Sequence, residues 1–289
     1  MGLIVYLNGE FVPYEKALIP IEDRGNVYAD GIYEVVRFYG GKPLELNSHF
    51  ERLAKSAAAI RLELPPLSSL IDAALETARR NRENEADSIH QNLYIQVTRG
   101  VAPRKHPFPA EAKPTVFMIA RSAPRPEREL LENGAAAITV PDIRWHRCDI
   151  KSLCLLPNVL AKQQAVEAGA YEAIFIRDGV VTEGSSSNLF MVKDGALWTH
   201  PSDHYVLPGI THRVVVRLAE KENIPVHFAT FLVSQLMAAD EIFITSTTSE
   251  IMPITRLDGK PVNDGRPGPI TRRLQKGFDA LVERVMKEA

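Results

Sequence analysis

Three Asp-Gly dipeptides, each between two β-like runs, limit the folds open to the C-terminal half of this chain. They are Asp178-Gly179, Asp194-Gly195 and Asp258-Gly259. Asp-Gly is a favoured pair for the two-residue turn of a β-hairpin, in which both residues take positive φ. Near the start, Asn8-Gly9 separates two further β-like runs in the same way. We therefore expect several antiparallel hairpins rather than a regular βαβ sheet.

Helical patterns occur in separate segments between these hairpins. Ser48 and Glu51 have capping-box spacing ahead of an apolar stripe, so a helix is expected to begin there. Further helices are predicted at about residues 70–78, 157–169, 211–221 and 270–285. Strands are predicted at 33–39, 93–97, 115–119, 173–177 and before Lys151. Hairpins mixed with separate helices indicate an α+β fold.

The length of the chain favours two domains. At 289 residues with 45% hydrophobic residues, a single core is near its practical limit. Residues 121–129 (RSAPRPERE) combine two prolines with charge and show no periodicity, which is typical of a linker. We predict a smaller α+β N-terminal domain over residues 1–122 and a larger C-terminal domain over residues 123–289.

Charge and composition argue against several function classes. The 34 Lys and Arg and 36 Asp and Glu give a net charge of −2, which offers no general attraction for nucleic acid or an anionic membrane. No signal-peptide pattern precedes the short apolar run near the start, and no uncharged apolar stretch approaches the roughly 20 residues of a membrane span. The two cysteines, Cys148 and Cys154, cannot form a disulfide framework. A cytoplasmic protein is expected.

Lys151 and Glu183 are the first candidates for chemistry. Lys151 precedes the apolar residues Leu155 and Leu156, so its amine is expected to lie against a core, where it would form a Schiff base more readily. The alternative is a lysine whose stem packs while its amine reaches solvent. Glu183 follows the Asp178-Gly179 turn and begins the run EGSSSN, whose glycine and hydroxyls suit a ligand but also an ordinary turn.

Three segments offer groups that bind anions. Residues 207–211 (LPGIT) lead into a predicted helix, whose first N–H groups suit a phosphate. Ser246 and Thr247 follow a predicted strand, and Arg52 lies just inside the helix predicted near Ser48. Taken singly, each segment is also explained by a cap, a turn or a solvated arginine.

A proline-rich loop carries two cationic candidates, Arg104 and His106. They stand in residues 102–109 (APRKHPFP) and are close enough to bind one carboxylate together. A solvated basic loop is the alternative. His200 and His204 also invite a metal site, but Pro201 lies between them and no further ligand is evident, so no metal is expected.

Taken together, these segments resemble the fold-type IV pyridoxal-phosphate aminotransferases, and among them the D-amino-acid aminotransferases. The resemblance spans almost the whole chain, in matching order and spacing. Its motifs are residues 21–25 (IEDRG), 30–35 (DGIYEV), 49–53 (HFERL), 96–100 (QVTRG) with the Arg104 loop, 147–153 (RCDIKSL), 183–188 (EGSSSN) and 245–250 (TSTTSE).

The resemblance implies pyridoxal 5′-phosphate as the cofactor and assigns residues to it. Lys151 would be the Schiff-base lysine and proton shuttle, Glu183 would face the pyridine nitrogen, and Leu207 would pack against the ring. The residues expected around the phosphate are Arg52, Ile210, Thr211, Ser246 and Thr247. Cys154 and His212 depart from the family, which often has Asn and a basic residue at these positions.

The resemblance also implies the substrates and the assembly. Tyr33, Arg104 and His106 would hold the substrate carboxylate, with Arg104 and His106 supplied by the neighbouring subunit of a homodimer. The expected reaction is ping-pong transamination between a D-amino acid, such as D-alanine, and a 2-oxo acid, such as 2-oxoglutarate. The alternatives on the same fold are a branched-chain L-amino-acid or (R)-amine aminotransferase and an aminodeoxychorismate lyase. A noncatalytic dimeric binding protein is the alternative from another class.

Overall fold

The computed structural model describes residues 2–84 and 89–287, which form two compact units. Unit 1 consists of Met1–Pro124, Ile150–Cys154 and Val285–Ala289, and unit 2 consists of Arg125–Asp149 and Leu155–Arg284. The units divide at Pro124, two residues beyond the domain boundary predicted at residue 122. Lys151 belongs to unit 1, although the prediction assigned residues 123–289 to one C-terminal domain.

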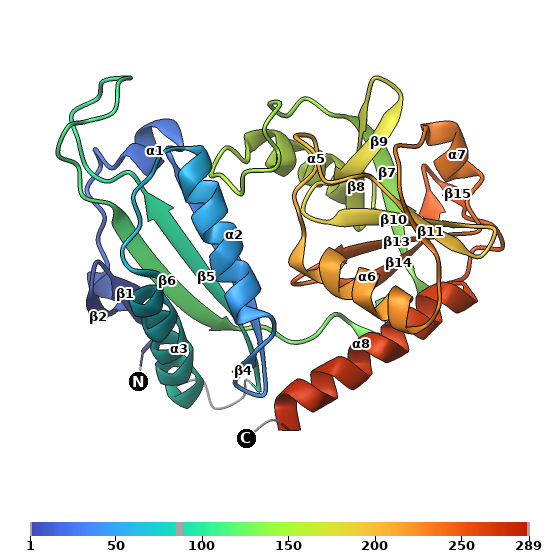
Figure 1. The fold of residues 1–289 in the computed structure, drawn as a ribbon, viewed down its shortest axis with the longest axis horizontal. Helices are drawn as coiled ribbons and strands as arrows, with labels where there is room; N and C mark the ends of the chain where they lie inside the picture. Colours follow the sequence, from blue (N-terminus) through green and yellow to red (C-terminus); the bar gives the residue numbers. More distant parts are fainter. Residues whose placement is uncertain (1, 85–88, 288–289) are drawn as a thin grey trace. The chain divides into compact units, whose positions relative to one another are not determined.

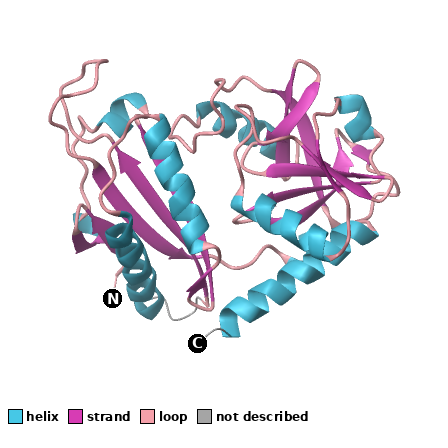
Figure 2. Ribbon diagram, in the orientation of Figure 1, coloured by secondary structure: helices cyan, strands magenta, loops and turns pink. Residues whose placement is uncertain are grey.

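Unit 1 is a sheet with helices packed on it (Figures 1 and 2). Its elements are β1 (Ile4–Leu7), β2 (Glu10–Pro13), η1 (Tyr14–Lys16), α1 (Arg24–Tyr28), β3 (Gly31–Tyr39), β4 (Lys42–Pro43), α2 (Leu46–Ala59), α3 (Leu67–Asn84), β5 (His90–Thr98) and β6 (Thr115–Ser122). Within the described residues the sheet has six strands in the order β2-β1-β6-β5-β3-β4, all paired antiparallel. Helix α2 packs on β3, and α3 packs on β1, β5 and β6.

The core of unit 1 lies between the sheet and these two helices. Phe50, Leu53 and Ala57 of the predicted stripe are buried there against strand residues such as Ile95 and Met118. The predicted capping box is wrong, because α2 begins two residues before Ser48. Its N-cap is Glu45, and the Ser48 hydroxyl donates to the Glu45 carboxylate instead of capping the helix.

Unit 2 contains a longer, mixed sheet. Its elements are α4 (Arg128–Asn133), β7 (Ala135–Pro141), α5 (Leu156–Glu167), β8 (Glu172–Arg177), β9 (Val180–Gly184), β10 (Asn188–Lys193), β11 (Ala196–Thr199), α6 (Ile210–Lys221), β12 (Val226–Phe228), α7 (Val233–Met237), β13 (Glu241–Ser246), β14 (Glu250–Leu257), β15 (Lys260–Pro261) and α8 (Pro269–Lys287). In the part of the chain that is described, the strand order is β12-β11-β10-β13-β14-β7-β8-β9, and β15 pairs with β14.

The three Asp-Gly turns make antiparallel hairpins, as predicted. They join β8 to β9, β10 to β11 and β14 to β15. In the first turn Asp178 has φ +52° and Gly179 has φ +80°, the backbone that a two-residue hairpin turn requires. The sequence did not predict the parallel pairs of β7 with β8 and β14, or of β11 with β12. The α+β architecture is confirmed, with these parallel pairs inside the second sheet.

The predicted helices of unit 2 are present, and α6 and α8 bury their apolar stripes, whereas α5 buries only Ala161 and Ala165. Helix α5 has Pro157 in its first turn, and Gly169 follows its end with φ +67°. Leu274 and Phe278 of α8 are buried, as the C-terminal stripe predicted. The strand expected before Lys151 is β7, which ends at Pro141, and the residues between Pro141 and Lys151 form no strand or helix.

Candidate active site

The backbone of Lys151 is fixed against the start of β3. The N–H of Tyr33 donates to the carbonyl of Lys151 over 3.0 Å, and the N–H of Leu153 donates to the carbonyl of Gly31 over 3.0 Å. The intervening Ser152 bridges Ile32. Two hydrogen bonds to a sheet strand therefore hold Lys151 in one place within unit 1, although it lies in no helix or strand.

The amine of Lys151 lies against an aromatic ring rather than an aliphatic core. Its Nζ atom is 4.2 Å from the centroid of the Tyr33 ring, and the side chain is half-buried. Leu156, which was expected to help shield the amine, is 68% exposed. The structure thus brings together two predicted site residues, Lys151 and Tyr33.

Arg52 is held in a buried cluster with Glu34 and His49. Its Nε and Nη2 atoms donate to the two oxygens of Glu34 over 2.7 and 2.9 Å, and the same carboxylate lies 2.8 Å from Nδ1 of His49. Burial opposes the charge of Glu34, but Arg52 and His49 outweigh it and lower the pKa of Glu34. Burial lowers the pKa of His49, and the positive charges of Arg52 and Lys151 add to this shift. The sequence did not predict that Glu34 pairs with Arg52, or that the charge of Lys151 acts on the pKa of His49.

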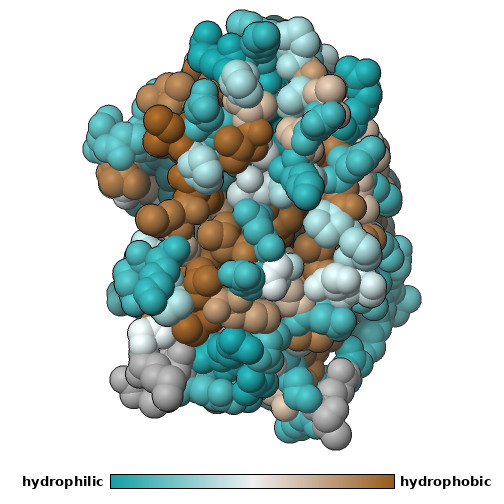
Figure 3. Space-filling view, turned by 90° about the vertical axis from the view of Figure 1, so that its left-hand side faces the viewer, coloured by the Kyte–Doolittle hydropathy of each residue, from teal (hydrophilic) through white to brown (hydrophobic). Residues whose placement is uncertain are grey.

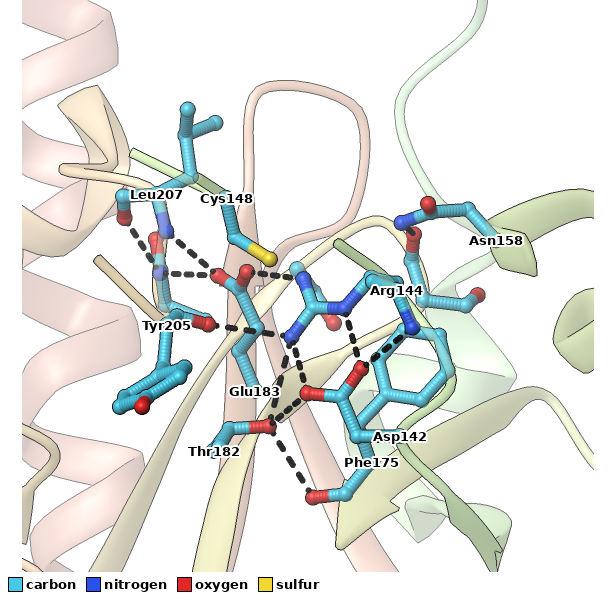
Figure 4. Close-up of polar contacts among 12 residues, drawn as sticks. Asp142, Arg144, Cys148, Asn158, Phe175, Thr182, Glu183, Tyr205 and Leu207 are labelled. Atoms are coloured by element: carbon cyan, nitrogen blue, oxygen red, sulfur yellow. Dashed lines mark hydrogen bonds and ion pairs between the residues drawn. The ribbon is translucent and has the colours of Figure 1, made fainter. Parts of the chain in front are cut away.

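Glu183 is fully buried in β9, with both carboxylate oxygens in use (Figure 4). Oε1 accepts from Nη1 of Arg144 over 2.5 Å. Oε2 accepts from Asn188 Nδ2 and from the backbone N–H of Leu207, each over 3.0 Å. Burial raises the pKa of Glu183 to about 7, and Arg144 only partly offsets this shift.

Arg144 stands between two carboxylates and was not singled out from the sequence. Besides Glu183, its guanidinium contacts Asp142 with Nη2 to Oδ2 at 2.9 Å, and Asp142 also pairs with Arg177 at 3.0 Å. Burial opposes the charge of Asp142, but Arg144 outweighs it and lowers the pKa of Asp142. Arg144 and Glu183 are 39 residues apart, and no local pattern in the sequence connects them.

The N-terminus of α6 offers backbone donors beside Glu183. Its N-cap is Gly209, and no side chain caps the helix, so the first N–H groups at Ile210 and Thr211 are suited to an anion. A Cβ at Gly209 would lie 1.8 Å from Oδ1 of Asn188, so only glycine fits there. Asn188 therefore contacts Glu183 on one side and the start of α6 on the other.

Ser246 and Thr247 lie at the end of β13, which packs against α6. Asn188 pairs with Thr245, the neighbour of Ser246, across the β10–β13 ladder. Both hydroxyl-bearing side chains are half-buried. Unit 2 thus brings Glu183 next to Leu207 and the start of α6, and β10 connects this region to the end of β13 at Ser246.

Of the two residues that depart from the family, His212 is buried and Cys154 is not. His212 is stacked on Phe190, with centroids 4.7 Å apart, and its Nε2 is 3.1 Å from the Thr199 hydroxyl. Burial lowers the pKa of His212 to about 4, so this residue adds no positive charge near neutral pH. Cys154 is exposed.

Arg104 and His106 lie in an exposed loop of unit 1. The guanidinium of Arg104 is 5.4 Å from the ring centroid of Tyr28, and the His106 ring is 5.3 Å from the same ring. The structure brings these two predicted residues together with each other. Within residues 2–84 and 89–287, it shows no contact between them and Lys151 or Tyr33.

Among the described residues, no three His, Cys, Asp or Glu side chains gather closely enough to hold a metal ion. Within residues 2–84 and 89–287, no helix combines the length and the apolar character that a membrane span needs.

The fold and these residues define a class of enzyme. Residues 31–257 match the family described as amino-transferase class IV, so the chain belongs to this family. Enzymes of this class use pyridoxal 5′-phosphate, and the protein is a pyridoxal-phosphate-dependent aminotransferase.

Two curated relatives are similar along nearly the whole chain. The D-alanine aminotransferase of Staphylococcus haemolyticus is 48% identical over 281 residues, which cover 96% of this chain and 98% of the relative. The D-alanine aminotransferase of Listeria monocytogenes is 47% identical over 287 residues, which cover 98% of each. These matches confirm the resemblance described above.

Solved structures of branched-chain amino acid aminotransferases share the fold. The enzyme of Escherichia coli superposes with a TM-score of 0.88 at 27% identity, covering 98% of this chain and 95% of that one. The enzyme of Thermoproteus uzoniensis, solved with norvaline, gives a TM-score of 0.88 at 27% identity, covering 99% of this chain and 97% of that one. The fold-type IV prediction is therefore confirmed.

Proposed function

We propose that this enzyme transfers the amino group between a D-amino acid, such as D-alanine, and a 2-oxo acid, such as 2-oxoglutarate. The observation that carries the choice of substrate is the difference in similarity between two groups of relatives. Identity is 48% to a D-alanine aminotransferase but 27% to a branched-chain enzyme of the same fold. The loop with Arg104 and His106, to which the family resemblance assigns the substrate carboxylate, agrees with this choice.

The donors and acceptors of unit 2 fit pyridoxal 5′-phosphate. A carboxylate has about four acceptor positions, and Arg144, Asn188 and Leu207 fill three of those of Glu183. One position on Oε1 is left for the protonated ring nitrogen of the cofactor. Asn188 also approaches Gly209, the N-cap of α6, and the uncapped start of this helix offers N–H groups to the phosphate.

The proposed cofactor ligands are those identified from the sequence. Lys151 would hold the cofactor covalently, Glu183 would face its ring nitrogen and Leu207 would pack against the ring. The phosphate would be bound by the residues Arg52, Ile210, Thr211, Ser246 and Thr247. The guanidinium of Arg52 is already oriented before a phosphate binds, because its Nε and Nη2 atoms donate to the carboxylate of Glu34.

The chemistry follows from these groups. When bound, pyridoxal 5′-phosphate withdraws electrons from the α-carbon of an amino acid, which makes the α-proton removable. The amino group of the substrate would first replace the Lys151 amine on the cofactor. The freed amine would then move a proton from the α-carbon to the cofactor in the first half-reaction and in the opposite direction in the second. Glu183 holds the proton on the ring nitrogen as a carboxylate, a state that Arg144 supports. The Tyr33 ring, 4.2 Å from Nζ, limits where the amine can move.

We infer that Tyr33, Arg104 and His106 bind the substrate carboxylate, the last two across a homodimer. Arg104 and His106 face Tyr28 in their own chain, which agrees with a role toward a partner's site. Apolar side chains reach the surface on the face shown in Figure 3. In unit 1, Leu18 is 78% exposed and Ile21 is 88% exposed. In unit 2, α5 exposes Leu156 and Val159.

The decisive assay is a panel of D- and L-amino acids with 2-oxoglutarate, in which both the 2-oxo acid product and the configuration of the new glutamate are measured. We expect turnover of D-alanine with D-glutamate as product, and a reduced but measurable kcat/KM for D-alanine in Arg104→Ala. Turnover restricted to L-amino acids would show a branched-chain L-amino-acid enzyme, and turnover of simple (R)-amines would show an amine aminotransferase. Pyruvate released from aminodeoxychorismate would show a lyase.

Borohydride reduction separates an enzyme from a binding protein. We expect the reduced cofactor on the peptide that contains Lys151, and no adduct in Lys151→Ala, as seen by mass spectrometry. A colourless protein without an adduct would indicate a noncatalytic binding protein. A cytoplasmic location stays a prediction from the cysteine content.

A further inference from the structure

Arg24 contacts the backbone of the loop that carries Arg104 and His106. Arg24 is the first residue of α1 and is buried. Its Nη1 atom donates to the carbonyl of Lys105 over 2.7 Å, and its Nη2 atom donates to the carbonyl of His106 over 3.3 Å. A planar guanidinium can bind two neighbouring carbonyls at once, which a lysine amine cannot do with the same geometry. Arg24 thus holds the loop between its two cationic side chains.

Asp30 orients Arg24 and connects it to a second arginine. Its Oδ2 atom accepts from Nε of Arg24 and from Nε of Arg99, each over 2.8 Å. Burial opposes the charge of Asp30, but the two arginines lower its pKa and keep it ionised. The guanidinium of Arg99 lies 3.7 Å from the ring centroid of Phe108, near the other end of the loop. The loop is therefore held by Arg24 and by Arg99, and both arginines pair with Asp30.

The ring of Tyr28, at the end of α1, packs beside the side chains of Arg104 and His106. Its ring centroid is 4.8 Å from the guanidinium of Arg24, 5.4 Å from that of Arg104 and 5.3 Å from the His106 ring. The Tyr28 hydroxyl is buried without a hydrogen-bond partner in the described structure. The ring, rather than the hydroxyl, accordingly makes the contacts.

The loop itself has little regular structure to fix these side chains. Residues 102–109 lie in no helix or strand, and Arg104 and His106 are exposed. An exposed loop must lose conformational entropy before two of its side chains can bind one carboxylate together. Contacts that order the loop in advance reduce that cost.

We propose that Arg24 and Tyr28 are positioning residues, which hold the loop so that Arg104 and His106 present a preformed site to the carboxylate of both substrates. This proposal rests on the proposed function of Arg104 and His106. If it holds, the affinity for substrate depends on two residues of α1, although α1 contacts no reacting atom.

The first test measures the loop without any assay of activity. Hydrogen–deuterium exchange of residues 101–109 is compared between the holoenzyme and Arg24→Met. Asp30 keeps its pairing with Arg99 in this variant, so no buried carboxylate loses all its cations. Arg79→Met is the matched control, because Arg79 is an exposed arginine of unit 1 that pairs with Glu76 and Glu83 on its own helix.

We expect exchange in residues 101–109 to rise about tenfold in Arg24→Met and to stay unchanged in Arg79→Met. Arg24→Lys keeps the charge and is expected to give an intermediate rise. Unchanged exchange in Arg24→Met would overturn the proposal, whatever the enzyme turns out to catalyse.

The second test separates positioning from a general loss of structure. Arg24→Met and Tyr28→Ala are expected to raise KM for the D-amino acid and for the 2-oxo acid about tenfold, with kcat within about threefold. Tyr28→Phe keeps the ring and is expected to restore KM. In the Arg104→Ala background, Arg24→Met is expected to raise KM by a smaller factor than in the wild type, because the part of its effect that passes through Arg104 is already lost.

The outcomes distinguish the proposed D-amino-acid activity from the positioning role of Arg24. A wild-type enzyme inactive on all D-amino acids would refute the proposed function and leave the exchange result standing. An equal KM effect of Arg24→Met with and without Arg104 would overturn the positioning role while leaving the D-amino-acid activity intact.

Discussion

Replacing Arg144 with methionine removes the cation that holds Glu183. Nη1 of Arg144 lies 2.5 Å from Oε1 of Glu183, with the two side chains 5% and 6% exposed. Breaking a buried pair by deleting one partner costs about 3–5 kcal/mol, because the other charge is left buried. Asp142 keeps Arg177 at 3.0 Å, so Glu183 is the carboxylate that loses its cation.

The cost should depend on pH, with a sign set by Glu183. Burial raises the pKa of Glu183 from 4.5 to about 7, so the side chain is mostly neutral near pH 5 and mostly charged near pH 8. Because the folded pKa is raised, Glu183 lowers the free energy of unfolding as the pH increases from about 4.5 to about 7. Arg144 opposes this loss only where Glu183 is charged. The destabilisation by Arg144→Met is therefore expected to be larger at about pH 8 than at about pH 5.

Chemical denaturation of the cofactor-free protein, followed by tryptophan fluorescence, measures the free energy of unfolding of unit 2. Both tryptophans, Trp145 and Trp198, belong to unit 2, as do Arg144 and Glu183. In the Glu183→Gln background, Arg144→Met is expected to cost about 2 kcal/mol less at about pH 8. Arg128→Met, at an exposed pair with Glu132, is the control and should cost less than about 0.5 kcal/mol. An equal cost in both backgrounds, or a larger cost at the lower pH, would refute the reasoning.

Two further predictions concern the cofactor site and the core. Gly209→Ala places a Cβ 1.8 Å from Oδ1 of Asn188, so Asn188 must move and release Glu183 and Leu207. We expect the affinity of the cofactor-free protein for pyridoxal 5′-phosphate to fall at least about tenfold in a spectroscopic titration, and an unchanged affinity would contradict this account. Leu274→Ala, at a fully buried position of α8, is expected to lower the free energy of unfolding by about 2–5 kcal/mol in the same denaturation assay. A loss below about 1 kcal/mol would show that α8 packs loosely there.

The sequence alone determined the features that a few neighbouring residues encode. Positive φ at Asp178 and Gly179 is a local preference, so the hairpin follows from the dipeptide itself. The stripes of α2 and α8 follow from helical spacing, since one face of a helix must be buried. The start of α2 was misjudged because the capping-box pattern occurs within the first turns of a helix whose N-cap is Glu45.

The candidate site was predictable only in part. Lys151, Glu183 and the start of α6 were proposed because motifs resembling those of a known family carry them, and their roles stay predictions. Lys151 was expected against a core, yet its amine lies on the ring of Tyr33, a residue that comes from β3. That contact depends on how Ile150–Cys154 pairs with the start of β3, which no spacing within the segment reveals.

Only the tertiary structure decided which charges meet. Arg144 follows β7 and Glu183 lies in β9, and the register of β7 with β8 and of β8 with β9 brings them together across 39 residues. The same holds for Glu34 and Arg52, which come from a strand and a helix. Backbone conformation is set by interactions within a few residues, so the sequence determines it directly. The pairing and the pKa values of buried charges depend on burial and on partners distant in the chain, which exist only once the chain has folded.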